Sequence, residues 1–359
     1  MKKFLIILAS ALALASCTPA VTTQVGIVLP TKDEERWIQD QTRFQDALKT
    51  AGVSAEVMFS EKDSAKEKAN VETLITKGIK VLVLCPVDSA SAAAAADAAA
   101  KAGVKVVAYD RLITGTKNVD FYVTFDSFNV GAAWGTYLVS QAKGTGNNLD
   151  LYAGAASDNN AFIFFEGAWS VLQPKIADGT FKIVNSDAAV ALQAKAQLTR
   201  DEEASIIGQV TTNWNPNDAK SKAEANLTKA TKAQKGTAFV LSPNDQTARA
   251  IADAFAADKD IKKAYTTGQD ADKASIQYII DGKQSMTVLK DTRTLVADAI
   301  KTATTFLGGK VPEQTKTYNN GVIDVPAKPS EVVSVTQENV KAAIVDSGYY
   351  AASLFTNLK

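Results

Sequence analysis

Short apolar runs rich in β-branched residues alternate with longer segments of helical periodicity from residue 25 onward. Strands that are buried on both faces of a parallel sheet have this continuous apolar character, and the segments between them suit crossover helices. The predicted strands are Val25–Leu29, Val81–Leu84, Val104–Tyr109, Phe121–Phe125, Leu149–Ala153, Phe181–Val184, Ala238–Leu241, Ala264–Thr266 and Met286–Leu289. The pattern predicts a doubly wound α/β fold, repeated in two lobes.

Helical signals occupy the segments between these runs. Residues recur near helical spacing after the first strand at Trp37, Gln41, Phe44 and Leu48. Gly52 follows them, where a helix end commonly needs a left-handed residue. The Ala-rich stretch 89–102 is interpreted as a crossover helix, because Ala is the best helix former and a predicted strand follows. Residues 195–235 hold few large apolar side chains, so we expect them to be more exposed.

The N-terminus has the pattern of an export signal. Two lysines precede an apolar stretch over residues 4–14, and small residues stand before Cys17. This arrangement predicts a lipoprotein signal peptide over residues 1–16, cleavage before Cys17 and a diacylglyceryl group on its thiol. A general signal peptide that happens to contain a cysteine is the alternative. With residues 17–24 as a tether, the lipoprotein would lie in the periplasm or at the cell surface, attached to the membrane only by its lipid.

Composition and charge exclude several classes of function. The 359 residues include 39 basic and 39 acidic ones, so the net charge gives no reason to expect binding to nucleic acid. The sequence has no histidine, which removes Ser-His-Asp and Cys-His nucleophiles and His-ligated metal sites. Gly26 stands alone before a charged turn, so no glycine-rich loop is available for a dinucleotide or nucleoside triphosphate. Cys85 lies in an apolar run, which predicts a buried and inert thiol.

Polar residues gather where the predicted strands end. Ligands of open α/β sheets bind beyond the carboxyl ends of the strands, so side chains at these ends converge on one crevice. The candidates are Lys32, Arg36, Asp110, Arg111, Asp158, Asn160, Asn244, Asp270 and Lys290. Carboxylates and guanidinium groups can engage two adjacent hydroxyls of a sugar, and Trp37 and Trp214 offer flat faces suited to a pyranose ring.

Each candidate also has a purely structural interpretation. Asp110 and Arg111 could form a helix cap with a surface ion pair, and residues 158–160 could be only a turn and a helix start. Trp37 could be a core residue of its helix. Lys32 and Lys290 could lie on the surface, as most lysines do.

Seven short segments occur in the order in which they are found in a known family. They are 35–37 (Glu-Arg-Trp), 108–112 (Ala-Tyr-Asp-Arg-Leu), 121–126 (Phe-Tyr-Val-Thr-Phe-Asp), 157–161 (Ser-Asp-Asn-Asn-Ala), 242–245 (Ser-Pro-Asn-Asp), 268–271 (Gly-Gln-Asp-Ala) and 318–321 (Tyr-Asn-Asn-Gly). With them the chain resembles the periplasmic sugar-binding proteins of the type I binding-protein superfamily, nearest the xylose-binding and multiple-sugar-binding members.

The resemblance implies two Rossmann-like lobes with parallel sheets, joined by a three-strand hinge. The chain would cross between the lobes near Asp126, Asp291 and Asn320. The N-terminal lobe would comprise residues 25–126 and 291–320, and the C-terminal lobe residues 127–290 and 321–359.

The resemblance also implies a sugar site between the lobes. Its hydroxyl ligands would be Arg36, Asp110, Arg111, Asp158, Asn160, Asn244 and Asp270, and its stacking residues Trp37 and Trp214. Asn213 stands where multiple-sugar binders carry an arginine, so their sugar preference does not transfer. The sequence has no calcium-loop pattern of the kind found in some galactose-binding relatives, and we expect no metal and no cofactor.

The expected function is that of an extracytoplasmic solute-binding lipoprotein of an ABC sugar importer, and not of an enzyme. It would bind an aldopyranose such as xylose, glucose or galactose and deliver it to an ABC transporter permease. A chemosensory sugar receptor acting on a chemoreceptor, and a nucleoside-binding or furanose-binding protein of the same fold, are the alternatives. A glycosidase that uses Asp110 and Asp270 is a third.

Overall fold

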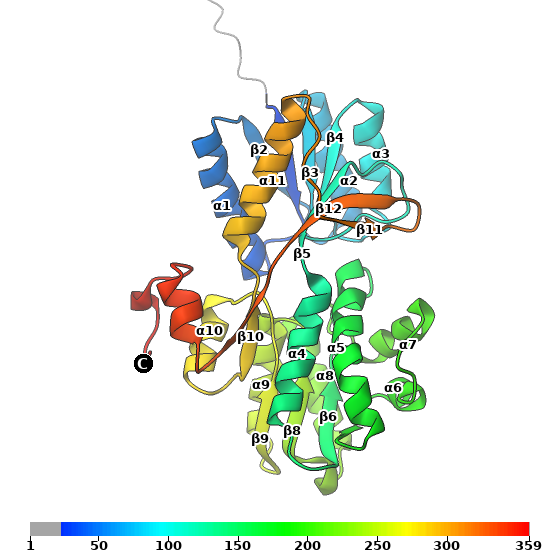
Figure 1. The fold of residues 1–359 in the computed structure, drawn as a ribbon, viewed down its shortest axis with the longest axis vertical. Helices are drawn as coiled ribbons and strands as arrows, with labels where there is room; N and C mark the ends of the chain where they lie inside the picture. The colour runs from blue at the N-terminus through cyan, green and yellow to red at the C-terminus, as the bar shows by residue number, and fades with distance from the viewer. Residues whose placement is uncertain (1–22, 359) are drawn as a thin grey trace, which may run out of the picture.

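Two sheets with helices on both faces make up the part of the chain that the computed structural model describes, residues 23–358 (Figure 1). In the N-terminal lobe the strand order is β11-β12-β5-β4-β3-β1-β2, and all neighbours are parallel except β11 and β12. Its strands are β1 (Val25–Leu29), β2 (Ala55–Phe59), β3 (Val81–Leu84), β4 (Lys105–Tyr109), β5 (Phe121–Phe125), β11 (Lys316–Asn319) and β12 (Asp324–Ser330). Its helices are α1 (Glu35–Ala51), α2 (Ser64–Thr76), α3 (Ala93–Lys101) and α11 (Thr292–Leu307).

Both faces of this sheet are buried, which explains its unbroken apolar strands. Ile27 and Leu29 pack with α1 and α11 on one face, and Val28 packs with α2 and α3 on the other. Because successive side chains of a strand point to opposite faces, a strand covered on both sides must be apolar at every position.

The C-terminal lobe has a four-stranded parallel sheet of order β7-β6-β8-β9. These strands are β6 (Asn147–Leu151), β7 (Phe181–Ile183), β8 (Gly236–Leu241) and β9 (Ile261–Thr266), and β10 (Met286–Leu289) pairs with β13 (Val333–Thr336) in a separate antiparallel ribbon. The helices are α4 (Ser127–Gln141), α5 (Asn159–Ala177), α6 (Asp187–Leu192), α7 (Arg200–Val210), α8 (Pro216–Lys229), α9 (Asp245–Ala257) and α10 (Lys273–Ile280). Short helical turns follow at η1 (Lys232–Gln234), η2 (Lys341–Asp346) and η3 (Ala352–Leu354).

Helices α4 and α5 pack unusually closely beside this sheet (Figure 1). A Cβ atom at Gly131 of α4 would overlap the carbonyl of Phe164, and one at Gly167 of α5 would overlap the carbonyl of Phe128. These glycines let the two backbones touch, and α5 carries several residues of the site described below.

The chain passes between the lobes at the β5–α4, β10–α11 and β12–β13 connections (Figure 1). The first two lie at Asp126 and Asp291. The third was expected near Asn320 but lies after Ser330, because β12 pairs in parallel with β5 in the N-terminal sheet. The assignment of residues 321–330 to the C-terminal lobe was therefore wrong. The two prolines of β12, at 326 and 329, hide the strand in the sequence because they remove backbone donors.

The predicted α/β fold with two mainly parallel sheets is confirmed, and Cys85 is buried as expected. Burial raises the pKa of the Cys85 thiol well above its ordinary value. Four predicted strands, Val25–Leu29, Val81–Leu84, Phe121–Phe125 and Met286–Leu289, have the predicted ends, and the other five recur with shifted ends. Strands β2, β11, β12 and β13 were not predicted. The predicted signal peptide and Cys17 lie outside the described residues. No helix within residues 23–358 is long and apolar enough to span a membrane.

Candidate functional site

Side chains from both lobes converge on a small cavity of about 20 Å³ at the face where the lobes meet. The cavity is lined by Glu34, Arg36, Trp37, Asp110, Arg111, Asp158, Asn160, Phe164, Trp214, Asn244, Gln269, Asp270 and Lys290. Every predicted ligand residue except Lys32 is in this set. Three lining residues, Glu34, Phe164 and Gln269, were not predicted.

Arg36 in the first turn of α1 is held in place by a buried carboxylate one turn further along the helix. Its Nε and Nη2 donate to Asp40 at 3.0 to 3.2 Å, and the hydroxyl of Tyr109 also donates to Asp40 at 2.9 Å. Arg36 Nη2 also donates to Asp110 Oδ2 at 3.0 Å. Arg36 Nη1 has no hydrogen-bond acceptor among residues 23–358 and lies 3.6 Å from Asp270 Oδ1. The Nη1 group of Arg36 is therefore available to donate a hydrogen bond to a ligand.

Asp110 follows β4 in a left-handed conformation, with φ at 60°. Its backbone carbonyl accepts hydrogen bonds from the side chains of Tyr122, Thr124 and Asn160, which hold this strained residue in position. Burial acts to raise the pKa of the Asp110 carboxyl, but the positive charges of Arg36, Lys290 and Arg111 outweigh it and leave the pKa below its ordinary value. Asp110 is thus an ionised acceptor at neutral pH.

Arg111 and Asp158 form an ion pair across the two lobes. Arg111 Nε lies 2.9 Å from Asp158 Oδ2, and both side chains are less than one-tenth exposed. Asp158 also caps α5 by accepting from the backbone N–H of Asn160. The surface ion pair between Asp110 and Arg111 that we considered as an alternative is ruled out, because both are buried and each pairs with another residue. Asp158 and Asn160 thus begin α5 and also line the cavity.

A second charged pair lies at the hinge. Lys290 directly follows β10, and its Nζ lies 2.8 Å from Asp270 Oδ1 and 4.0 Å from Asp110 Oδ2. Asp270, like Asp110, has a positive φ, here 97°. Asn244 caps α9, and its side-chain oxygen accepts from the N–H and the hydroxyl of Thr247. Lys290 lies between the carboxylates of Asp110 and Asp270, so positive and negative charges alternate around the cavity. The positive φ angles that position the two carboxylates cost conformational energy.

Aromatic side chains border the cavity from opposite lobes. Trp37 belongs to α1 and Trp214 to the turn between α7 and α8, so the two rings belong to different lobes, as predicted. Trp37 also packs in the N-terminal core, so it is a core residue of its helix and lines the cavity as well. The Trp214 ring lies against Gly154, where an added Cβ would overlap it, and makes an edge contact with Phe164 at 6.3 Å between ring centroids.

The errors of the sequence-based prediction at three positions have physical explanations. Phe164 follows Asn160 by one helical turn within an apolar segment and cannot be distinguished there from core residues. Gln269 lies beside Asp270 and was quoted in the same motif, which was a usable signal. Lys32 is exposed, and its ammonium lies 5.0 Å from the Phe59 ring centroid instead of lining the cavity.

Comparison with known proteins agrees with this geometry. The model of a periplasmic binding protein domain matches residues 25–310. A multiple sugar-binding periplasmic protein of Azospirillum brasilense is 35% identical over 340 residues, which cover 92% of this chain and 90% of that protein. A multiple sugar-binding periplasmic receptor of Rhizobium radiobacter is 34% identical over 342 residues, covering 91% of each.

A solved structure is more similar still. The carbohydrate transporter solute-binding protein of Chloroflexus aurantiacus, crystallised in complex with D-glucose, is 68% identical, with a TM-score of 0.92. The match covers 93% of this chain and 98% of that one. The chain therefore belongs to the periplasmic binding protein family, a family of binding proteins and not of enzymes.

Proposed function

We propose that this protein is the extracytoplasmic receptor of an ABC sugar importer and that it binds an aldopyranose, with D-glucose as the first candidate. The observation that carries the proposal is the alternating set of buried acids, bases and amides around a cavity bordered by Trp37 and Trp214. The 68% identical protein whose structure contains D-glucose supports the choice of sugar. Xylose and galactose are the other two candidate sugars.

The ligand would be captured by closure of the lobes. Hydroxyls would be bound from one lobe by Arg36, Asp110 and Arg111, and from the other by Asp158 and Asp270. Sugar contacts made by both lobes exist only when the lobes are closed, so the sugar shifts the population toward the closed form. Hinge closure of periplasmic binding proteins is the standard example of this motion.

Direct contacts between the lobes support this mechanism. Besides the Arg111–Asp158 pair, Asn160 Nδ2 donates to the carbonyl of Asp110 at 2.8 Å. Residues that line the cavity thus also join the two lobes. A sugar that orders these side chains would stabilise the closed arrangement for delivery to a permease.

Isothermal titration against D-glucose, D-galactose, D-xylose, D-ribose and a nucleoside tests the assignment. We expect 1:1 binding of an aldopyranose, and stronger binding of ribose or of the nucleoside would contradict it. Lys32→Ala is the matched control, because Lys32 lies outside the cavity, and its affinity should equal that of the wild type.

Small-angle scattering and intrinsic fluorescence test the closure step. The radius of gyration should fall when the sugar is added, and the fluorescence of the tryptophans should change with saturable 1:1 dependence. A sugar that binds tightly without changing the scattering curve would rule out capture by closure.

A sugar receptor that signals to a chemoreceptor is the second candidate. The receptor of Rhizobium radiobacter, at 34% identity, favours it. Both roles use the same sugar site and differ in the protein partner, which is a permease for import and a chemoreceptor for sensing. Sugar uptake that is lost on deletion of the gene supports import, whereas lost chemotaxis with intact uptake supports sensing.

A further inference from the structure

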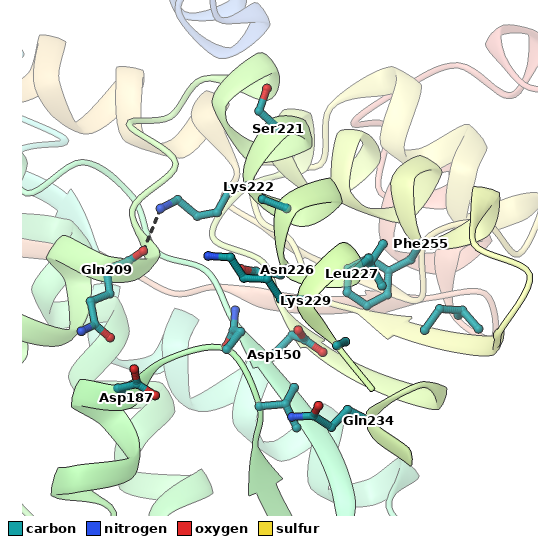
Figure 2. A pocket seen from close by; sticks show the side chains of 15 residues that line it. Asp150, Asp187, Gln209, Ser221, Lys222, Asn226, Leu227, Lys229, Gln234 and Phe255 are labelled. Atoms are coloured by element: carbon teal, nitrogen blue, oxygen red, sulfur yellow. Dashed lines mark hydrogen bonds between the residues drawn. The ribbon is translucent and has the colours of Figure 1, made fainter. Parts of the chain in front are cut away.

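A second cavity lies within the C-terminal lobe and shares no lining residue with the site between the lobes. It has a volume of about 630 Å³ and lies beside α8 (Figure 2). It is on the sheet face opposite the core formed with α4, α5 and α7. The side chains of α6 and α7 pack into that opposite core, at Ala189, Ile206 and Ile207.

Asp150 on β6 faces this cavity from an inner strand of the sheet. Its neighbours Leu149 and Leu151 point to the opposite, apolar face. Asp150 is only 6% exposed, yet no hydrogen-bond donor and no cation pairs with its carboxyl within residues 23–358. Burial alone raises the pKa of Asp150 to about 7.

The polar groups around Asp150 are bonded to each other and not to its carboxyl. Asn148 donates to the carbonyls of Ala233 and Lys235, and Asn226 donates to the Tyr152 hydroxyl at 3.1 Å. A buried carboxylate without a donor is costly, whereas one that faces a cavity can take its partner from a bound molecule. A protonated amine is the group that satisfies it best, because it supplies both charge and donors.

Positive charge lies nearer the mouth of the cavity. Lys229 is exposed and forms no ion pair with another described residue, and Lys222 is half-buried and donates to the carbonyl of Gln209 at 2.7 Å (Figure 2). An acid at the buried end and two lysines toward solvent suit a ligand with opposite charges at its two ends. Leu227 and Phe255 add an apolar wall for a short carbon chain.

We propose that this cavity is a second ligand site that takes a small zwitterion, with its ammonium group on Asp150 and its anionic group beside Lys222 and Lys229. Free amino acids have this chemistry. The site does not depend on the sugar-binding proposal, because the two cavities have no residue in common.

Titration of the mature protein with glycine, L-alanine, L-glutamate and γ-aminobutyrate tests the proposal, with and without D-glucose. At least one zwitterion should bind, and ethylamine and acetate, which carry one charge each, should bind more weakly. Asp150→Asn should lower the affinity about tenfold or more, as expected for loss of a charge-assisted hydrogen bond. Glu224→Gln, which changes an exposed carboxyl of α8 outside the cavity, should leave it unchanged.

The proposal is overturned if no zwitterion of the panel binds or if Asp150→Asn binds it as tightly as the wild type. Equal circular dichroism spectra and sugar affinities of the two proteins establish that the variant is folded. Competition by D-glucose would place the zwitterion between the lobes and would also overturn the proposal.

Discussion

Gln39 Nε2 of α1 donates a hydrogen bond of 2.8 Å to the hydroxyl of Tyr350, which joins the N-terminal lobe to the last segment of the chain. That segment packs on α10 and β10 of the other lobe through Ile344 and Phe355. Beside this contact, the guanidinium carbon of Arg43 lies 4.6 Å from the Tyr349 ring centroid. The C-terminal segment thus forms a contact between the lobes outside the sugar site.

We expect Tyr350→Phe to weaken sugar binding, although Tyr350 does not line the cavity between the lobes. The closed form loses one hydrogen bond, worth about 0.5–1.5 kcal/mol, so the affinity should fall roughly two- to tenfold. Titration measures this, and Gln39→Ala should cost the same amount. A double variant in which the two losses add in full would show that the pair does not interact.

Asp110→Ala should lower sugar affinity about ten- to a hundredfold, because it removes an ionised, charge-assisted acceptor. Arg36 retains Asp40 as its partner, so the protein should still fold. Titration and a thermal melt separate the two effects. Unchanged affinity with an unchanged melting temperature would place the sugar elsewhere.

Gly154→Ala should disturb the site through Trp214. The new Cβ would overlap the indole ring of Trp214, so the ring must leave its present position in the lining of the cavity. We expect affinity to fall about tenfold, since a stacked aromatic contact contributes about 0.5–1.5 kcal/mol beyond burial and the strain adds to it. The control is Gly208→Ala in α7, where no atom lies near the added Cβ. Equal affinities for the two variants would contradict a role for Trp214.

Stability should depend on pH through Glu67, a buried residue whose Oε2 accepts from the N–H of Val87 at 2.7 Å. Burial raises the pKa of Glu67 from 4.5 to about 7. The folded state therefore holds its proton more tightly than the unfolded state does. The stability from this group is fully present below pH 4.5 and is lost as the pH rises to about 7.

Glu67→Gln keeps an acceptor for Val87 but cannot ionise. Because the pKa of Glu67 is raised from 4.5 to about 7 in the folded state, the free energy of unfolding of the variant relative to the wild type should rise by up to about 3 kcal/mol between pH 4.5 and pH 8. Urea unfolding of both proteins at the two pH values measures the gain. A difference that stays constant with pH would mean that Glu67 titrates normally.

We expect Cys17 to be lipidated, because an apolar leader and small residues precede it. Metabolic labelling with a fatty acid should mark the wild type and not Cys17→Ser. Equal labelling of the two proteins would favour the general signal peptide.

The sequence predicted most of the residues that line the cavity between the lobes, because they follow buried strands whose apolar runs are easy to recognise. Asp110 and Asp270 were found by this position, while their positive φ angles had no local signal. Edge strands were harder to predict, since β2 is only partly buried and lacks a continuous apolar run. The partners of Asp110 and Arg111 could not be assigned either, because Asp110 pairs with the distant Arg36 of its own lobe and Arg111 with Asp158 of the other lobe, and tertiary contacts decide both pairs.

The late position of β11 and β12 in the chain sets an order of folding. The sheet of the C-terminal lobe, β6 to β9, is built from one continuous stretch, residues 147–266. The N-terminal sheet instead needs residues 316–330 to pair with β5, which ends at Phe125. Contacts so distant in sequence form slowly. In a chain that emerges from its N-terminus, the four-stranded sheet of the second lobe can therefore be completed first, and the sheet of the first lobe must wait for residues 316–330.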